Sequence, residues 1–549
     1  MVDGEEQVAL LRVESRVIDR GVATFTTLVS DPGEAAGRDP GEPWDAEHWN
    51  GRLVYRFGGG CGTTYSQGFN FFDAPDLQLL ADGYAFATNT LDTFQVQCQD
   101  ILSAEAAMMT KEYFAENYGP PVVTIGEGGS GGAIQQLLIA QNYPGILDAI
   151  VPSLPFPDAM SIAPGVVDCA LLGAYYGTGP GAALTPEQRS AINGHLSPLT
   201  CTLWEQTFVP MVDPAVWLRR RRRRCDHRPA RSRGGLPTVP DELAFDAESN
   251  PDGLRCTLQD SYPQVLGRDP QTSHVRRPLD NTGVQYGLEA LNDGVIDAEE
   301  FVVLNERIGG LDLDANPVPE RMVADESDLE ALYRTGRVVA GGGLLDIPVI
   351  AVNVYTDDEG DIHDRFRMFS LEERLAGEDG SRAPGYVMWT LPPSADGNLL
   401  DQLSGAVDVG ASAVRLADEW ASALAEADAG EPRQEALART RPDAAVDTCF
   451  DAAGEVVDAG DGIYESEGPC RDDFPVGDDP RTAAGAPLAN DIVKCSLQPV
   501  ADAIESGLYG VDLTEEQATR LEAVFPEGVC DWTRPGVGQV ALGDPWQVF

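Results

Sequence analysis

The sequence predicts an α/β fold built on a mostly parallel, doubly wound sheet with a large inserted cap and a disulfide-stapled C-terminal extension. Strand-like and helix-like segments alternate over the first 150 residues and again after residue 346, which is typical of parallel strands joined by helices. Between them the sequence is rich in proline and mostly helical or irregular. We therefore expect a sheet domain in two parts, 1–153 and 346–430, a cap at 154–345, and a C-terminal wrap, 431–549, packed on the core.

The individual elements follow from the periodicity of the apolar residues. Apolar runs bounded by turn residues predict strands, and apolar residues three or four positions apart predict helices. In chain order we expect strands at 52–57, 84–88, 121–126, 148–151, 347–355 and 386–391, with helices at 103–117, 133–140 and 365–376.

The acidic composition excludes two classes of partner. The chain has 38 Lys and Arg against 89 Asp and Glu, for a formal net charge of −51. Such a charge repels nucleic-acid phosphates and anionic membranes. We also find no run of about 18 apolar residues of the kind that crosses a bilayer. The sequence therefore predicts neither a nucleic-acid partner nor a membrane, and it leaves the oligomeric state open.

The ten cysteines predict disulfides and an exported protein. Their number is even and no Cys-x-x-Cys pair occurs, which disfavours a zinc ribbon or a thioredoxin-type site. Disulfides persist in extracellular or periplasmic compartments. Residues 1–6 lack the basic and apolar regions of a signal peptide, so we expect that the signal is absent from this sequence. We expect sequential pairing, namely Cys61–Cys98, Cys169–Cys201, Cys225–Cys256, Cys449–Cys470 and Cys495–Cys530.

A basic segment interrupts the acidic sequence within the predicted cap. Residues 219–224 are six consecutive arginines, and 219–233 contains nine. A block of like charge is usually solvated and disordered. We therefore interpret this segment as a solvated loop or a short frame error in a GC-rich gene, in preference to an anion-binding or partner-binding patch.

Ser130 is the candidate nucleophile. It stands in Gly128-Gly129-Ser130-Gly131-Gly132, a Gly-x-Ser-x-Gly motif between a predicted strand and a predicted helix. This turn needs small residues around a strained serine. The helix start also directs backbone N–H groups toward the place where an oxyanion forms. The N–H of Gly131 is therefore the first candidate donor of an oxyanion hole.

A second glycine-rich loop, 58–62, directly follows the first predicted strand. In hydrolases with the serine motif, a loop at this position donates the second N–H of the oxyanion hole. We expect Gly60 or Cys61 to be that donor. The alternatives are a tight turn or a phosphate cradle, but neither glycine-rich loop has the Lys of a P-loop.

His363 is the candidate general base. Three of the five histidines, His195, His227 and His274, lie in the predicted cap, and His48 precedes the first predicted strand. His363 alone follows a predicted sheet strand, which places it at the carboxyl end of the sheet where open α/β folds bind ligands.

The acid of the triad is expected just before this histidine. Asp358 or Asp357 fits, because the order Ser, Asp, His is then kept. Asp396, after the next predicted strand, and Asp158, after the preceding one, are the alternatives.

We expect no metal site. Residues 289–300 superficially resemble an EF-hand loop, but Leu291 stands where calcium requires an oxygen ligand. The segment instead predicts a capped helix that begins at Asp297.

These motifs resemble the tannase and feruloyl-esterase side of the α/β-hydrolase superfamily. More closely, the chain resembles secreted bacterial hydrolases of unassigned function, and it is also similar to 3-hydroxybutyrate-oligomer hydrolases. The resemblance implies a secreted serine hydrolase with a large lid and disulfides. Two features depart from tannases, since Gly129 replaces the Cys beside the nucleophile and no His follows 386–391. The matching segments are 49–53, the glycine-rich loop at 58–62, 128–132, 280–287, 360–364 and 525–532.

The predicted activity is cofactor-free hydrolysis of carboxylic esters through a covalent acyl-enzyme. A large cap favours an acyl or alcohol group bulkier than acetate, so we expect aromatic esters or polyester oligomers as substrates. One alternative is an amidase or peptidase with the same triad. The other is a catalytically silent hydrolase fold that acts as a binding protein, which the missing His after 386–391 favours.

Overall fold

The computed structural model describes residues 10–29, 44, 47–63, 67–68, 75–214, 242–243, 245–246, 248–377, 379–393, 399–427 and 430–545. The arginine-rich segment 219–233 lies outside these residues, together with Cys225 and His227 inside it. Asp396, one of the alternative acids, also lies outside them.

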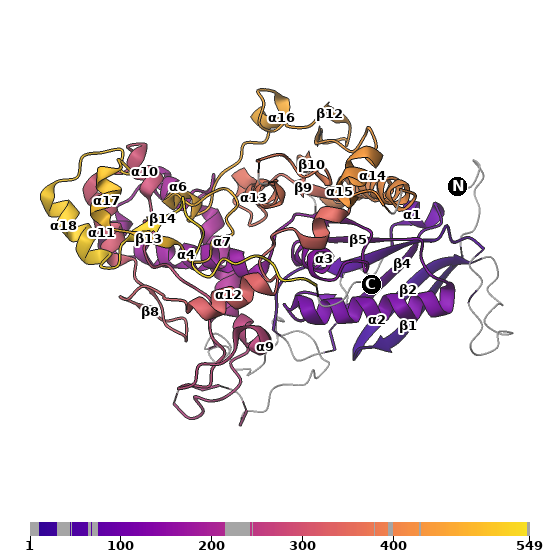
Figure 1. The fold of residues 1–549 in the computed structure, drawn as a ribbon, viewed down its shortest axis with the longest axis horizontal. Helices are drawn as coiled ribbons and strands as arrows, with labels where there is room; N and C mark the ends of the chain where they lie inside the picture. The colour runs from indigo at the N-terminus through magenta and orange to yellow at the C-terminus, as the bar shows by residue number, and fades with distance from the viewer. Residues whose placement is uncertain are drawn as a thin grey trace.

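Ten strands of the described chain form one sheet (Figure 1). They are β1 (Leu10–Ile18), β2 (Gly21–Val29), β3 (Arg52–Gly58), β4 (Ala85–Thr93), β5 (Val123–Gly129), β6 (Ala149–Ser153), β9 (Val349–Val354), β10 (Tyr386–Leu391), β11 (Thr448–Phe450) and β12 (Val456–Ala459). Their order is β1-β2-β4-β3-β5-β6-β9-β10-β11-β12. All neighbours from β4 to β11 are parallel, and the outer pairs are antiparallel. The predicted mostly parallel sheet is confirmed.

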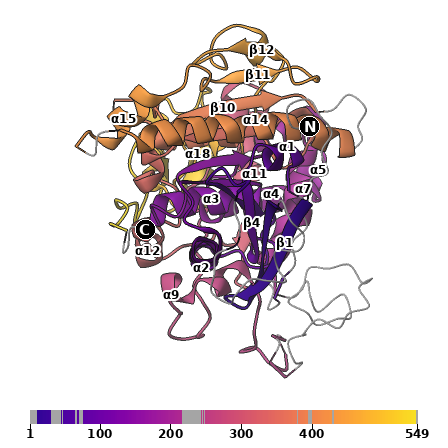
Figure 2. The ribbon, with the colours of Figure 1, turned by 90° about the vertical axis from the view of Figure 1, so that its right-hand side faces the viewer.

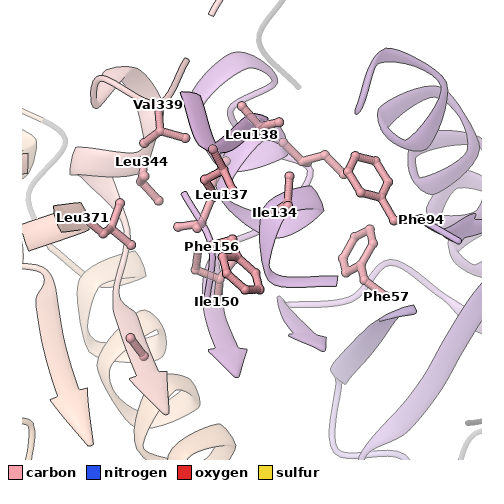
Figure 3. Close-up of a cluster of buried hydrophobic side chains, with 14 of the residues drawn as sticks. Phe57, Phe94, Ile134, Leu137, Leu138, Ile150, Phe156, Val339, Leu344 and Leu371 are labelled. Atoms are coloured by element: carbon pink, nitrogen blue, oxygen red, sulfur yellow. The ribbon is translucent and has the colours of Figure 1, made fainter. Parts of the chain in front are cut away.

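Helices cover both faces of this sheet, as a doubly wound fold requires. The helices of the sheet domain are α1 (Leu77–Ala81), α2 (Asp100–Tyr118), α3 (Gly131–Asn142), α13 (Phe366–Leu375), α14 (Leu399–Ala425) and α15 (Arg433–Thr440). α14 crosses one face, over β5, β6 and β9 (Figure 2). On the other face, Ile134 and Leu137 of α3 lie in one buried cluster with Phe57 and Ile150 from the strands (Figure 3). The central strands are therefore buried from both sides, which holds the β5–α3 turn in place.

The six predicted strands and three predicted helices are all present, with ends shifted by a few residues. The β1–β2 hairpin is absent from the prediction. Val13 and Val17 of its edge strand are 61% and 70% exposed, so the apolar residues of this strand do not form the buried face that a strand pattern indicates. β11 has only three residues, too few to carry a pattern.

Part of the predicted cap forms a second lobe beside the sheet (Figure 1), with an apolar core that includes Val167 and Phe301, whereas Tyr262 and Leu332 of the cap join the core of the sheet domain. The elements of the cap are α4 (Ala159–Tyr176), α5 (Gly179–Ala182), α6 (Pro186–Asn193), α7 (Leu199–Phe208), η2 (Val209–Met211), η3 (Leu258–Ser261), α9 (Pro263–Leu266), α10 (Leu288–Asn292), α11 (Ala298–Arg307), β7 (Gly310–Leu311), β8 (Pro317–Val318), α12 (Glu326–Arg334) and η4 (Gly342–Asp346). α4 is long and apolar enough to cross a membrane by length and composition, but 67% of that window is buried inside the protein. Apolar side chains of α4 such as Leu171 and Leu172 belong to the core of this lobe.

The C-terminal segment divides between the two lobes. β11 and β12 extend the sheet. Leu521 and Cys530, farther along the chain, join the core of the cap, and Arg520 forms ion pairs with Glu299 and Glu306 of α11. The predicted single wrap on the sheet domain thus differs from the structure. The remaining elements are η5 (Asp357–Glu359), α16 (Pro469–Asp472), η6 (Thr482–Ala484), β13 (Ser496–Gln498), α17 (Val500–Glu505), α18 (Glu515–Val524) and β14 (Val529–Asp531).

Two local predictions are confirmed. All four disulfides whose cysteines are both described follow the sequential pairing: Cys61–Cys98, Cys169–Cys201, Cys449–Cys470 and Cys495–Cys530. Cys256 is also disulfide-bonded. The carboxylate of Asp297 accepts a hydrogen bond from the Glu300 N–H at 2.8 Å, and that of Glu300 accepts one from the Asp297 N–H at 2.9 Å. This capping box begins α11, as predicted.

Candidate active site

Ser130 occupies a strained turn between β5 and α3. Its backbone has φ 57° and ψ −120°, a region that a side chain rarely adopts. The Ser130 N–H donates to the carbonyl of Ser153 on β6 at 2.9 Å, and the Ser130 carbonyl accepts from Ala133 and Ile134 in the first turn of α3. The hydroxyl makes no capping hydrogen bond to the helix, so it is available for chemistry.

The glycines around Ser130 are required because the second glycine-rich loop lies directly against the turn. A Cβ on Gly131 would stand 1.9 Å from the carbonyl oxygen of Gly60. A Cβ on Gly132 would stand 2.5 Å from the carbonyl oxygen of Phe57. Any side chain at these positions would separate the loop from the turn. The motif therefore sets how closely the predicted oxyanion donors approach the nucleophile.

Backbone hydrogen bonds hold the loop at 58–62 in place. The Gly62 N–H donates to the Phe94 carbonyl at 2.9 Å, and the Gly59 carbonyl accepts from the Gln95 N–H at 2.9 Å. Within the described chain, no acceptor takes the N–H of Gly60 or Cys61. The N–H of Gly131, in the first turn of α3, has no intrahelical acceptor. All three predicted oxyanion donors line one pocket with Ser130.

His363 lies in the loop after β9 and η5, and its Nδ1 is 2.6 Å from the Oδ1 of Asp361. The same oxygen accepts a hydrogen bond from the His363 N–H at 2.9 Å. Within the described residues, Nε2 makes no hydrogen bond. With Nδ1 bound to a carboxylate, Nε2 is the nitrogen that can accept a proton.

Asp361 is the carboxylate that contacts the histidine, so the prediction of Asp358 or Asp357 as the orienting acid is corrected. Asp358 is exposed and makes no hydrogen bond to His363. Asp357 is buried and accepts the Arg365 N–H at 3.0 Å. Burial and the negative charge of Asp364 raise the pKa of Asp357 to about 8, so it is mostly protonated at neutral pH.

The pKa of Asp361 moves in the opposite direction. Burial acts to raise it, but the hydrogen bond and the charge of His363 outweigh burial and lower the pKa below its usual value. Asp361 therefore stays ionised at neutral pH. A carboxylate in this state orients an imidazole and stabilises its protonated form.

Asp158, the alternative acid, contacts residues of α4 and α13. Its carboxylate accepts from the Ser161 N–H at 2.7 Å at the start of α4, and it pairs with the Arg374 guanidinium at 2.8 Å.

His363 and Ser130 approach the same region from neighbouring strands. β9, which precedes His363, pairs with β6, and β6 pairs with β5. The ring of Phe156, which lines the pocket with Ser130, is 5.4 Å from the His363 ring. No hydrogen bond joins Ser130 to His363 in the described structure. Catalytic hydrogen bonds are commonly long in ligand-free proteins and tighten when substrate binds.

The other described histidines do not meet the requirements of a base. His195 is buried between Asp364, 3.5 Å from its Nδ1, and Cys169, and burial lowers its pKa to about 4. His48 is exposed and His274 half-buried, and neither lines the pocket. The side chains of Cys169, His195 and Cys201 lie close enough together to be metal ligands, but the two cysteines are joined in a disulfide.

An apolar pocket opens beside Ser130 and was not predicted from the sequence. Its cavity volume is about 60 Å³. The described residues that line it are Gly60, Cys61, Ser130, Gly131, Ile134, Phe156, Ala159, Ile162, Ala163, Val166, Val167, Trp204, Phe208, Met211, Val212 and Leu258.

A family model described as a tannase-like family of unknown function (DUF6351) matches residues 1–541. The chain belongs to this tannase-like family. With the strand order and the Ser130 turn, this membership identifies the α/β-hydrolase fold that the sequence predicts. It also supports a hydrolase that acts on esters. No curated protein has significant sequence similarity to the chain.

Several solved structures are similar to this member of the tannase-like family. A prolyl endopeptidase aligns at 14% identity and a TM-score of 0.20 over 28% of this chain, which spans 22% of that protein. Esterase E22 aligns at 10% identity and a TM-score of 0.25, covering 79% of this chain and 100% of its own. Feruloyl esterase B from Aspergillus oryzae aligns at 12% identity and a TM-score of 0.22, covering 70% of this chain and 65% of its own.

The contact with His363 predicts a large effect of Asp361→Asn. An amide cannot stabilise the protonated imidazole, so kcat for an activated ester should fall about 100-fold or more. The matched control is Asp358→Asn, an exposed position in the same loop, which should keep kcat within about twofold. Steady-state kinetics on the two variants distinguishes the two carboxylates. If kcat fell only in Asp358→Asn, Asp358 would be the acid, as predicted from the sequence.

The Cys61–Cys98 disulfide should matter for activity as well as for stability. Replacing both cysteines by Ser opens a 37-residue separation and should lower the free energy of unfolding by about 4 kcal/mol. Cys495→Ser with Cys530→Ser opens a similar separation of 35 residues within the cap core. Denaturant unfolding should show comparable losses, but only the first pair should lower kcat, by about tenfold, because it frees the oxyanion loop. Equal activity in both would refute this role of the disulfide.

The raised pKa of Asp357 predicts a pH-dependent stability. The folded protein holds this proton up to about pH 8, whereas the pKa of an unshifted Asp carboxyl is 3.8. Between pH 3.8 and about pH 8 the unfolded state therefore binds fewer protons than the folded state. The free energy of unfolding falls as the pH rises through this range. Asp357→Asn removes the titration, so its gain in Tm over wild type should grow from pH 5 to pH 8 and then level off. Parallel Tm curves for the two proteins would contradict the shift.

Proposed function

We propose that this member of the tannase-like family is a serine hydrolase that cleaves carboxylic esters through a covalent acyl-enzyme. One observation carries the proposal. Ser130, in its strained turn and without a capping hydrogen bond to α3, lines an apolar pocket together with Gly60 and Cys61, whose N–H groups have no acceptor among the described residues. A nucleophile beside convergent backbone donors is the arrangement that acyl transfer requires.

In the proposed acylation step, the Ser130 Oγ attacks the ester carbonyl carbon while His363 Nε2 takes the hydroxyl proton. The carbonyl oxygen becomes an oxyanion, which accepts hydrogen bonds from the N–H of Gly131 and from that of Gly60 or Cys61. The bond from the acyl carbon to the alcohol oxygen then breaks, and the imidazolium gives its proton to the departing alcohol. Asp361 balances the charge of the imidazolium while it exists.

Deacylation repeats the sequence with water. His363 Nε2 takes a proton from the water as its oxygen attacks the acyl carbon, and the same amides stabilise the second oxyanion. The bond to the Ser130 Oγ breaks, the proton returns to that oxygen, and the carboxylic acid leaves. No cofactor takes part in this scheme.

The proposed setting and substrates follow from the disulfides and the cap. Four described disulfides are consistent with an extracellular or periplasmic protein. The apolar lining that α4 and α7 contribute to the pocket supports an acyl or alcohol group larger than acetyl. We therefore propose aromatic esters or polyester oligomers as the range of substrates, without a nucleic-acid or membrane partner.

The decisive variant is Ser130→Ala. It should abolish hydrolysis of p-nitrophenyl esters, with kcat falling at least about 1000-fold, because the covalent step is lost. Ser412→Ala, an exposed serine on α14 whose hydroxyl donates to the Asp408 carbonyl, is the control and should keep full activity. Circular dichroism verifies that both variants fold. If Ser130→Ala kept the turnover of the wild type, the proposal would be overturned. If the wild-type protein hydrolysed amides but no esters, the result would indicate an amidase.

A further inference from the structure

One wall of the pocket beside Ser130 is a continuous apolar stripe along α4. Ala159, Ile162, Ala163, Val166 and Val167 all line the pocket. Their spacing of three and four residues places them on one face of the helix. At 1.5 Å per residue the stripe extends over about 12 Å. The pocket is therefore bounded lengthwise by a hydrocarbon surface.

A second part of the lining comes from α7 and η2 and is also apolar. Trp204, Phe208 and Met211 line the pocket from this side, and α7 packs directly against α4. The Cys169–Cys201 disulfide joins the two helices. The two walls are thus held at a fixed separation before any substrate binds, which lowers the entropic cost of binding.

The lining has almost no polar side-chain group. Among the described lining residues, the Ser130 hydroxyl and the indole N–H of Trp204 are the polar side-chain groups, and no side chain is charged. The indole nitrogen is buried without a hydrogen-bond partner in the described structure. A single donor satisfies at most one acceptor. A trihydroxylated ring in this pocket would leave hydroxyls unpaired, each at a cost of about 1–3 kcal/mol.

We propose that this pocket is the acyl-binding site and that it selects saturated aliphatic acyl groups of medium length over hydroxylated aromatic ones. The inference rests on the proposed ester hydrolysis, but it replaces the range of aromatic esters or polyester oligomers given above by esters of aliphatic acids. The acyl group, not the alcohol, fits here because Ser130 and the amides of Gly60 and Gly131 line the same pocket. The acyl group stays bonded to Ser130 through both steps, whereas the alcohol must leave after the first.

Two matched ester pairs test this with the full-length protein. Ethyl octanoate and octyl acetate are isomers of equal composition, so a difference in kcat/KM reports which side of the ester the pocket holds. We expect ethyl octanoate to be favoured by at least about tenfold. Methyl benzoate and methyl gallate differ only in three hydroxyls, and we expect the benzoate to be favoured. Preference for octyl acetate or for methyl gallate would overturn the proposal.

A pocket-filling variant locates the effect. Ala163→Phe places a ring in the α4 stripe and should lower the ratio of kcat/KM for p-nitrophenyl octanoate to that for the acetate by at least about tenfold. Ala174→Phe adds the same ring at an exposed position of the same helix and should leave the ratio unchanged. An unchanged ratio in Ala163→Phe, with the variant folded by circular dichroism, would also overturn the proposal.

Failure of the proposed function gives a different result. If no ester, acetate included, is hydrolysed in a Ser130-dependent manner, the ester hydrolase itself is refuted. If p-nitrophenyl acetate is hydrolysed through Ser130 but octanoate is no better a substrate, ester hydrolysis stands and the aliphatic acyl site is refuted.

Discussion

The close approach of two backbone segments that lack side chains is the constraint on which the candidate site depends. Gly131, at the start of α3, and Gly60, after β3, come so near that a Cβ on Gly131 would stand 1.9 Å from the Gly60 carbonyl oxygen. β3 and β5 are parallel neighbours, so both segments leave the same edge of the sheet. The nucleophile and the donors for an oxyanion therefore meet because two adjacent strands end in glycine.

The cap completes the site at that edge. It enters the chain between β6 and β9, which are neighbours in the sheet, so α4 begins close to the carboxyl ends of the central strands. It also contacts the loop of His363. A Cβ on Gly360, which has φ 83°, would stand 2.8 Å from the side chains of Ser197 and Leu199. The same lobe thus forms the apolar pocket and braces the loop of the candidate base.

The sequence predicted the parts of the site that local backbone geometry determines. Ser130, Gly131 and the loop at Gly60 follow from glycine patterns that only a strand-to-helix turn and its neighbour require. His363 follows from its place after a strand. The acid was missed because Asp357, Asp358 and Asp361 all precede the histidine closely. The carboxylate that faces the imidazole ring is selected by the turn of η5 and by the positive φ of Gly360. The amino-acid composition of the loop does not predict this local geometry.

Packing between distant segments also escaped prediction. The sheet strands were found because buried strands carry dense apolar runs, whereas the exposed residues of β1 marked no face. The C-terminal segment looked like a single wrap because its many glycines and prolines say nothing about which lobe it joins. Its placement on the cap depends on Leu521 and Cys530 entering the core around α4 and α11.

The most direct test of the account is the site at which a serine-directed fluorophosphonate reacts with the folded protein, determined by peptide mass spectrometry. A strained serine beside backbone amides that have no acceptor in the described part of the chain should react as an activated nucleophile. We predict a single modified residue, Ser130, and loss of labelling when the protein is unfolded first. Labelling of another residue in the folded protein, or none at Ser130, would contradict the assignment of this turn as the catalytic centre.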